Sequence, residues 1–272
     1  MMKKEKKKFH FQLKHFIVLA IAILYFILCF FAFGTVDNKQ EEAPTIYLVF
    51  DAEHRFSYSD GKLDEAVDWN QIFGTRKFYS YSDGTYLGQY NLMAYNTMIY
   101  LFDDQNDSVD YPGTLFAYAA DKKIDVVPTG FKELDQNIKI VLSKLIEGND
   151  RMTMPSDDEL TMLQEIEVDL DGDSIEEVVY AINSMVGENN NQQFSFLCYE
   201  KNGELYRIIS NTNSTNDSDL MHYYTIAQIM DLDDDGTKEL IVRDVQYGTA
   251  ATEKYRIYKE EDGNYRMITS ET

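Results

Sequence analysis

The chain has 272 residues and a formal net charge of −22, with 47 acidic residues against 25 Lys and Arg. Because basic residues cluster only at the start of the chain, the composition argues against nucleic acid as a partner. The two cysteines, Cys29 and Cys198, do not amount to a disulfide framework. Low cysteine use with abundant Asn and Lys is typical of a bacterial surface protein.

The first 34 residues are predicted to place the chain at a membrane. Several lysines precede residues 16–33, which contain no charged side chain. A stretch of this length spans a bilayer as a helix, and the basic side stays in the cytoplasm. We expect a basic cytoplasmic tail over residues 1–15, a single transmembrane helix over residues 16–34, and an extracytoplasmic remainder. The alternative is a signal peptide cleaved after Gly34, which would give a secreted protein.

Residues 35–44 are interpreted as a short acidic spacer, and the chain is then rich in predicted strands up to residue 130. The dipeptides Asp60-Gly61 and Asp83-Gly84 predict hairpin turns. The acidic run 103–107 is interpreted as a polar turn. We expect the region 45–130 to hold either degenerate copies of the repeats described below or a separate small β domain. Its predicted strands are residues 45–50, 77–81, 97–102 and 115–119.

Residues 131–163 are predicted to form a helical insert between this region and the C-terminal repeats. Apolar side chains recur at helical spacing over residues 131–146, and Thr129 is a candidate cap. A second, short helix is expected within residues 155–163, with Ser156 as its cap. We expect the longer helix to cover a sheet edge rather than to bind a partner. Its apolar positions are Phe131, Leu134, Ile138, Val141, Leu142 and Leu145.

Two acidic loops within residues 164–272 carry the main functional signal. Each loop places carboxylates at positions 1, 3, 5 and 9 and then continues into an apolar segment. Carboxylates packed this closely repel one another unless a cation lies among them, and hard oxygen ligands suit Ca²⁺. The predicted side-chain ligands are Asp169, Asp171, Asp173 and Glu177 in the first loop, and Asp231, Asp233, Asp235 and Glu239 in the second.

The loops do not follow the EF-hand pattern, although they begin in a similar way. An EF-hand needs a bidentate Glu at position 12, where these loops have Tyr180 and Val242. Residues 165–170 also alternate between polar and apolar side chains, which predicts a strand rather than a helix before the first loop. We therefore expect up to two calcium ions in loops between strands, with the carbonyl groups of Ile175 and Thr237 as further ligands. The alternative is a pair of acidic, solvated hairpins without metal.

The rest of each repeat predicts about four strands, the size of a propeller blade. The turn dipeptides Asn202-Gly203 and Asp262-Gly263 follow the two loops at similar distances and are strong hairpin signals. The strand directly after each loop is apolar on both faces, as expected for an inner, buried strand.

These features resemble the FG-GAP and VCBS-type repeats of extracellular β-propeller proteins, which are related to integrin alpha chains. The resemblance covers residues 164–210 and 223–270, and it implies a calcium ion in the acidic loop of each repeat. Each loop keeps one of the two family glycines, Gly172 at position 4 of the first loop and Gly236 at position 6 of the second. Ser174 at position 6 makes the left-handed conformation less accessible to the first loop.

The sequence contains no catalytic motif that we could identify: G-x-S-x-G, H-E-x-x-H and phosphate-binding glycine loops are all missing. His54 lies in a charged segment with Asp51 and Glu53 that resembles an acid–base group, and a charged loop after a strand explains it more simply. His222 is interpreted as a strand-edge residue, and Cys198 as a core residue.

Together these signals predict a mainly β protein: a transmembrane helix, then an exported β-rich domain with two blade-like four-stranded repeats and one or two inserted helices. We expect a calcium-binding interaction module at the cell surface, contacting a protein or glycan. One alternative is an accessory or sensor subunit of a cell-envelope complex. Another is the accessory part of an extracellular hydrolase, which would require a concave site near Glu53 and His54.

Overall fold

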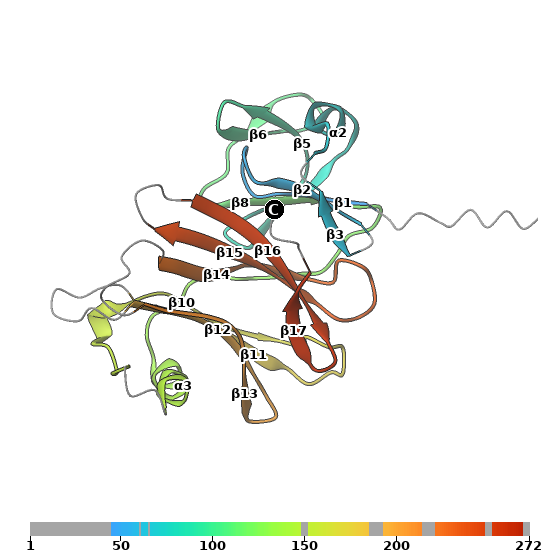
Figure 1. Cartoon of the computed structure of the whole chain (residues 1–272). Helices are drawn as coiled ribbons and strands as arrows, with labels where there is room; N and C mark the ends of the chain where they lie inside the picture. Colours follow the sequence, from blue (N-terminus) through green and yellow to red (C-terminus); the bar gives the residue numbers. More distant parts are fainter. Residues whose placement is uncertain are drawn as a thin grey trace, which may run out of the picture. The chain divides into compact units, whose positions relative to one another are not determined.

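In the computed structural model, Ala43–Thr272 form one compact unit. The structure describes residues 45–268 except residues 60, 65, 148–151, 185–192, 214–220 and 248–251. The predicted tail, transmembrane helix and spacer lie outside the described residues. In the part that is described, no helix has the length and apolar character needed to cross a membrane. The unit is mainly β, as the sequence predicts (Figure 1).

The region 45–130 supplies every strand of an eight-stranded sheet and does not form four-stranded blades (Figure 1). Its neighbouring strands are antiparallel in the order β3-β2-β1-β8-β4-β5-β6-β7. The four predicted strands are all present, shifted by at most a residue. The strands are β1 (Ile46–Val49), β2 (Arg55–Ser59), β3 (Lys62–Asp64), β4 (Phe78–Ser82), β5 (Thr85–Tyr95), β6 (Met98–Phe102), β7 (Ser108–Val109) and β8 (Leu115–Ala119).

Each of the two acidic repeats folds as four antiparallel strands in sequence order, as the sequence predicts. The second repeat gains a fifth strand, because β9 (Val126–Val127) pairs with β14. Both sheets are open, and within the described residues they do not close into a propeller. The strands are β10 (Leu160–Val168), β11 (Glu177–Ser184), β12 (Gln193–Lys201) and β13 (Glu204–Asn213), then β14 (Met221–Met230), β15 (Glu239–Tyr247), β16 (Thr252–Glu261) and β17 (Asn264–Met267).

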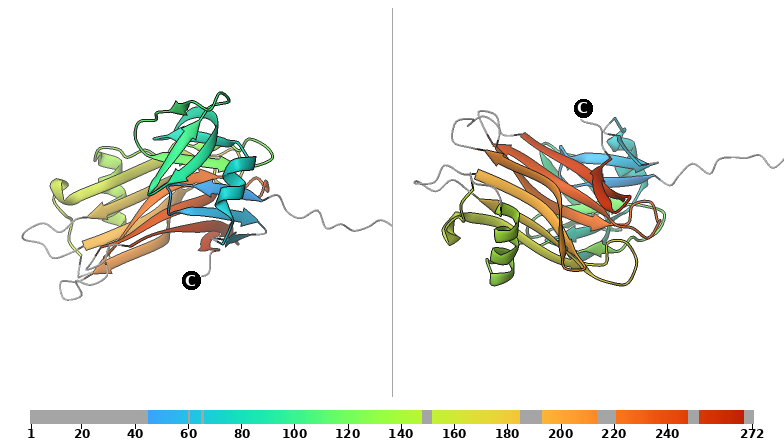
Figure 2. Two further views of the ribbon diagram at one scale, coloured as in Figure 1. Left: turned by 90° about the horizontal axis from the view of Figure 1, so that it is seen from above. Right: turned by 60° about the horizontal axis from the view of Figure 1, so that its bottom comes forward.

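The sheet of the second repeat is the middle layer of the unit. One of its faces packs on the first repeat, through a core that includes Val179, Leu197 and Val242. The other face packs on the eight-stranded sheet, through a core that includes Leu48 and Ile241. The two repeats accordingly run side by side in both views of Figure 2. The strands after the loops, β11 and β15, are buried on both faces, as predicted.

Side chains of the first repeat complete the hydrogen bonding of β14 in the second. The amide of Gln164 accepts from the N–H of Ile226 at 2.7 Å and donates to its carbonyl group at 2.9 Å. The amide of Asn183 donates to the carbonyl group of Tyr224 at 3.1 Å. These buried polar bonds fix the register of one repeat against the other, since an unpaired amide at these positions would be costly.

Among its described residues, the predicted insert holds one α-helix, α3 (Gln136–Ile146), which packs on the outer face of the first repeat. It begins five residues later than the apolar spacing suggests, because Asp135 caps it and accepts from the N–H of Ile138 at 3.0 Å. Thr129 is therefore not its cap. The second predicted helix is a single 3₁₀ turn, η1 (Asp157–Glu159), followed at once by β10.

The helix α2 (Trp69–Thr75) was not predicted; it covers the eight-stranded sheet, burying Trp69 and Phe73.

The predicted hairpin turns have the backbone that their sequences suggest. Both central residues have positive φ in Asp83-Gly84, Asn202-Gly203 and Asp262-Gly263. Two consecutive residues of this kind define the type I′ turn, which matches the twist of paired strands. Gly61 also has positive φ, between β2 and β3.

Candidate metal centre

Each acidic loop connects the first strand of its repeat to the second, and the two loops contact each other. The backbone N–H of Lys238 donates to the carbonyl oxygen of Leu170 at 2.7 Å, and its Nζ donates to that of Asp169 at 2.6 Å. A Cβ atom on Gly172 would lie 2.8 Å from the carbonyl oxygen of Gly236. The predicted sites are therefore neighbours, and only glycine fits at position 172 without a backbone shift.

The loops share one backbone conformation although their sequences differ. Positions 4 and 6 both have positive φ: 74° at Gly172 and 69° at Ser174 in the first loop, 64° at Asp234 and 91° at Gly236 in the second. Each loop thus has glycine at one of these positions and a non-glycine residue with left-handed backbone conformation at the other. Ser174 therefore adopts the left-handed conformation, although this conformation is less accessible to serine than to the glycine expected at position 6.

The aspartate at position 1 holds each loop closed by accepting backbone N–H groups. Asp169 accepts from Gly172 at 2.8 Å and from Ser174 at 3.0 Å. Asp231 accepts from Gly236 at 3.0 Å. These bonds explain why the same conformation forms with glycine at different positions.

The aspartate at position 5 accepts the N–H of the residue two positions further on. Asp173 accepts from Ile175, and Asp235 accepts from Thr237, both at 2.8 Å. The carbonyl groups of Ile175 and Thr237 remain predicted ligands.

The glutamate at position 9 is the buried member of each cluster, with 1% of the side chain exposed at Glu177 and 0% at Glu239. One carboxylate oxygen of each accepts a backbone N–H, from Leu170 at 2.9 Å and Leu232 at 2.7 Å. The second oxygen, Oε1, has no hydrogen-bond partner among the described residues, and neither does Oδ1 of Asp231. Burial raises the pKa of Glu239 to about 7.

The residues present fit a calcium ion. In each loop three carboxylates offer oxygen atoms that lie within 4.8 Å of one another, close enough to share one ion. An unpaired carboxylate oxygen in a buried position is costly unless a cation faces it. Hard oxygen donors alone favour Ca²⁺ over metals that prefer nitrogen or sulfur. The two sets are Asp169, Asp171 and Glu177, and Asp231, Asp233 and Glu239.

The ammonium group of Lys201 also lies in the first loop, and the sequence pattern did not predict it. Nζ of Lys201 forms an ion pair with Asp171 and lies 3.2 Å from Oε1 of Glu177 and 4.0 Å from Oδ2 of Asp173. The contact with Glu177 is an ion pair without hydrogen-bond geometry. Hydrogen bonding to Asp171 raises the pKa of Lys201, so this lysine is charged.

The second loop has the same arrangement. Nζ of Lys259 forms an ion pair with Asp233 and lies 2.7 Å from Oδ2 of Asp235 and 3.4 Å from Oε1 of Glu239. Burial alone would lower the pKa of Lys259, but hydrogen bonds to Asp233 and Asp235 raise it. The sequence signal for both lysines is a cation near the end of the third strand of each repeat. This signal can be interpreted only once the pairing of the strands is known.

His54 bridges two sheets. Its Nδ1 lies 2.8 Å from Asp51, and its Nε2 lies 3.2 Å from the carbonyl oxygen of Glu253 on β16. The hydrogen bond to Asp51 raises the pKa of His54. Because both ring nitrogens face acceptors, the imidazolium form satisfies this geometry. Asp51, His54 and Glu253 are close enough to share a metal ion, but both ring nitrogens already have partners.

The other side chains singled out in the sequence have structural surroundings. Nδ1 of His222 lies 2.6 Å from the buried carboxylate of Asp244, which also pairs with Arg256 at 2.9 Å. Cys198 is fully buried beneath α3, and burial raises the pKa of its thiol to about 12. Cys198 is thus a core residue, as predicted.

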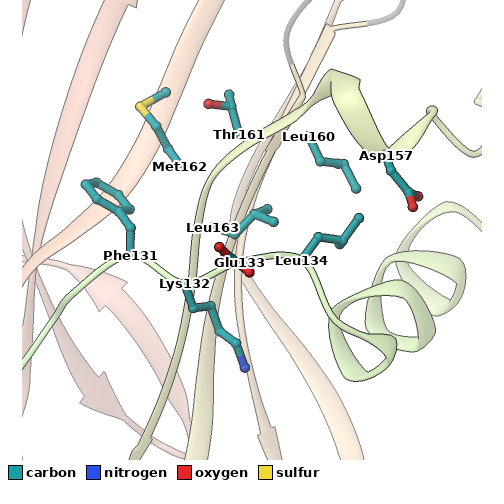
Figure 3. Close-up of a pocket in the computed structure, with 9 residues that line it drawn as sticks. All are labelled: Phe131, Lys132, Glu133, Leu134, Asp157, Leu160, Thr161, Met162 and Leu163. Atoms are coloured by element: carbon teal, nitrogen blue, oxygen red, sulfur yellow. The ribbon is translucent and has the colours of Figure 1, made fainter.

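A shallow pocket lies between the segment before α3 and the start of β10 (Figure 3). Two of its charged groups form ion pairs: Lys132 pairs with Asp135 and Glu165, and Asp157 pairs with Lys139. The side chain of Lys132 points away from the other lining residues (Figure 3). The pocket has a mixed polar and apolar lining without converging reactive groups. It is lined by Phe131, Lys132, Glu133, Leu134, Asp157, Leu160, Thr161, Met162 and Leu163.

An exposed apolar patch lies on the hairpin β5–β6. Met93 pairs with Tyr100, and Tyr95 pairs with Met98, so the four side chains form two adjacent cross-strand pairs on one face. Each of these residues is between 37% and 63% exposed. Residues 85–102 contain no charged residue and no histidine, in a chain that is otherwise rich in charge. We refer to Met93, Tyr95, Met98 and Tyr100 as the Met/Tyr patch.

No protein-family model, curated protein or solved structure matches this chain.

Proposed function

We propose that this protein is a membrane-anchored, extracytoplasmic β domain that binds up to two calcium ions and serves as an interaction module at the cell surface. The observation that carries the proposal is the buried glutamate of each loop. Glu177 and Glu239 each present one carboxylate oxygen without a hydrogen bond toward two aspartates. Such an arrangement at equivalent positions of two repeats supports a divalent-cation site, because a divalent ion would neutralise more carboxylate charge than the single lysine ammonium that faces each cluster.

Calcium would neutralise the carboxylates and link the start of β11 or β15 to the loop before it. Asp169, Asp171 and Glu177 would hold one ion; Asp231, Asp233 and Glu239 would hold the other. The proposal includes the FG-GAP and VCBS-type character of the repeats and the anchor over residues 16–34. Outside cells, millimolar calcium suits sites with dissociation constants of about 10⁻⁴ to 10⁻³ M.

The Met/Tyr patch supports the interaction role. Aromatic residues and methionine are enriched in protein interfaces, while Asp, Glu and Lys are depleted. The segment that follows the hairpin is acidic, with exposed Asp104 and Asp107 before β7 and exposed Asp110 after it. We therefore propose that the patch binds a protein segment whose apolar centre is bordered by Lys or Arg.

Thermal unfolding of the full chain with calcium and with chelator tests the metal part. At about tenfold excess over the dissociation constant, each site should add about 1.4 kcal/mol, which raises the Tm by a few degrees. Asp171→Ala and Asp233→Ala should each remove part of this rise. Asp107→Ala, in an acidic turn without a buried glutamate, is the matched control. An unchanged Tm on chelation would contradict the proposal.

A photoreactive residue in place of Tyr95 tests the interaction part. We expect a discrete crosslinked adduct that weakens when Asp104 and Asp107 are replaced by Lys, because the partner's basic border would then be repelled. The same probe at exposed Phe131 is the control. An adduct with a second copy of the chain, or one that the charge reversal leaves unchanged, would contradict this partner. An accessory or sensor subunit predicts instead that partners remain bound after deletion of residues 45–272.

A further inference from the structure

Lys201 and Lys259 occupy equivalent positions in the two repeats. Val178 pairs with Glu200 across β11 and β12, so the next antiparallel step places Lys201 beside Glu177. Likewise, Leu240 pairs with Tyr258 across β15 and β16, which places Lys259 beside Glu239. The same cation–carboxylate pair thus lies at the mouth of each loop, fixed by strand register rather than by a flexible contact.

Both ammonium groups point into the carboxylate cluster that the calcium ion would use. Nζ of Lys201 contacts two of the three clustered residues of the first loop, Asp171 and Glu177. The lysine side chains are mostly covered, with 28% exposed at Lys201 and 20% at Lys259. The ammonium groups are therefore the cations that stabilise the loops in this structure.

Lysine and calcium cannot use these oxygens together. Calcium binds oxygen at about 2.3–2.6 Å. An ion bound to Glu177 and Asp171 would lie against Nζ of Lys201, which is 3.2 Å from Oε1 of Glu177. Two positive charges at such a distance repel strongly in a partly buried site. One must leave, and the lysine has a flexible stem that reaches solvent.

A lysine does not satisfy the whole cluster. Oε1 of Glu177, Oε1 of Glu239 and Oδ1 of Asp231 all lack a hydrogen bond, and both glutamates are at least nine-tenths buried. A single positive charge faces at least three carboxylates in each loop. A divalent ion at the same place would neutralise more charge and coordinate the oxygens that lack a hydrogen bond, so exchange is favourable when calcium is abundant.

We propose that calcium enters each loop by displacing the lysine, Lys201 from the first loop and Lys259 from the second. The lysines are tethered cations that keep the loops folded when calcium is scarce and weaken calcium binding by competing with it. This inference rests on the proposed calcium function. It adds two specificity-determining residues and a calcium-dependent exposure of two ammonium groups beside the turns Asn202-Gly203 and Asp262-Gly263.

Calcium titration of Lys201→Met and Lys259→Met by calorimetry tests the competition. Methionine keeps the length and apolar stem but removes the charge. We expect the dissociation constant of the altered site to fall by about tenfold or more, a factor that corresponds to about 1.4 kcal/mol. With chelator, the same variants should lose several degrees of Tm, because the carboxylates then lack a counter-ion. A variant that folds only with calcium would also support the inference.

Lys122→Met is the matched control. Lys122 pairs with Asp234, which lies in the second loop at a position that is not a predicted ligand, and 60% of its side chain is exposed. This variant removes one positive charge near the loop without touching the cluster. Its calcium affinity should stay close to that of the unaltered protein.

Amine labelling of the unaltered protein gives an independent readout. Brief acetylation followed by mass spectrometry should show Lys201 and Lys259 protected with chelator and reactive with calcium, while Lys122 stays unchanged. If calcium binds but neither labelling nor the Met variants differ from the controls, the exchange is overturned and the calcium function stands. If the unaltered protein binds no calcium, both are overturned.

Discussion

The two acidic loops reach the same conformation from different sequences. The first has glycine at position 4 and serine at position 6, whereas the second has aspartate and glycine at these positions. All four residues have positive φ. The shared features are the aspartate at position 1, the buried glutamate at position 9 and the lysine across the strand. Hydrogen bonds and charge therefore hold these loops closed. Glycine lowers the backbone strain, and at position 172 it also leaves room for the carbonyl oxygen of Gly236.

The largest expected difference between the loops concerns their two glycines. Gly172→Ala should reduce the free energy of unfolding by about 4 kcal/mol, since its Cβ would meet the carbonyl oxygen of Gly236 in addition to the strained φ. Gly236→Ala should cost only about 1–2 kcal/mol, because no atom lies within 4 Å of the added Cβ. Denaturant unfolding of both variants measures the difference. Equal losses would show that the loops do not contact each other.

The second difference is the pH response of Glu239. Burial raises the pKa of Glu239 to about 7 in the folded chain, against 4.5 for an unperturbed Glu. The folded state then holds the proton more tightly than the unfolded state, so stability in chelator should fall as pH rises from about 4.5 to 7. Glu239→Gln should remove this fall, which amounts to at most about 3 kcal/mol.

Unfolding curves of the Glu239→Gln variant and the unaltered chain across this pH range, all in chelator, make the measurement. In chelator at pH 7 the variant should be the more stable of the two proteins. With calcium present it should be the less stable one, because it loses a ligand. Parallel curves for the two proteins would mean that Glu239 is not buried in this way.

The smallest expected effect comes from giving each loop its second glycine. Ser174→Gly and Asp234→Gly should each stabilise the fold by about 1 kcal/mol, because each removes the backbone strain of a non-glycine residue in the left-handed region. Thermal unfolding in chelator, with Gly130→Ala as a control at a glycine that has no positive φ and open space around it, checks this. Destabilisation by either change would mean that the replaced side chain contributes more than its strain costs.

Local signals predicted most of the fold. The alternating strands, the turn dipeptides and the double acidic motif each depend on neighbouring residues, so their physical causes are visible in the sequence. The predicted start of α3 was wrong. The apolar spacing continues through residues 131–135, but Asp135 caps the helix, which therefore begins at Gln136. The short helix α2 has too few turns to show a period, although Asp68 at its N-terminus is a signal that could have been used.

The rest depended on contacts between distant residues. Lys201 and Lys259 enter the loops only because β12 and β16 pair with the strands that carry Glu177 and Glu239. The pairing of β9 with β14 joins residues that lie about a hundred positions apart. The carboxylates that cluster in each loop could be picked out from the motif alone, because those of one loop lie within nine residues of one another. They are Asp169, Asp171 and Glu177, and Asp231, Asp233 and Glu239.

The most direct test of the central claim is a crystal structure of this protein grown with calcium at about 10 mM, roughly tenfold above the weakest dissociation constant typical of extracellular sites. We expect one ion in each loop, bound by its position 1, 3 and 9 carboxylates, with the ammonium groups of Lys201 and Lys259 turned out to solvent. Both lysines still paired with Asp171 and Asp233, and no ion beside them, would contradict it.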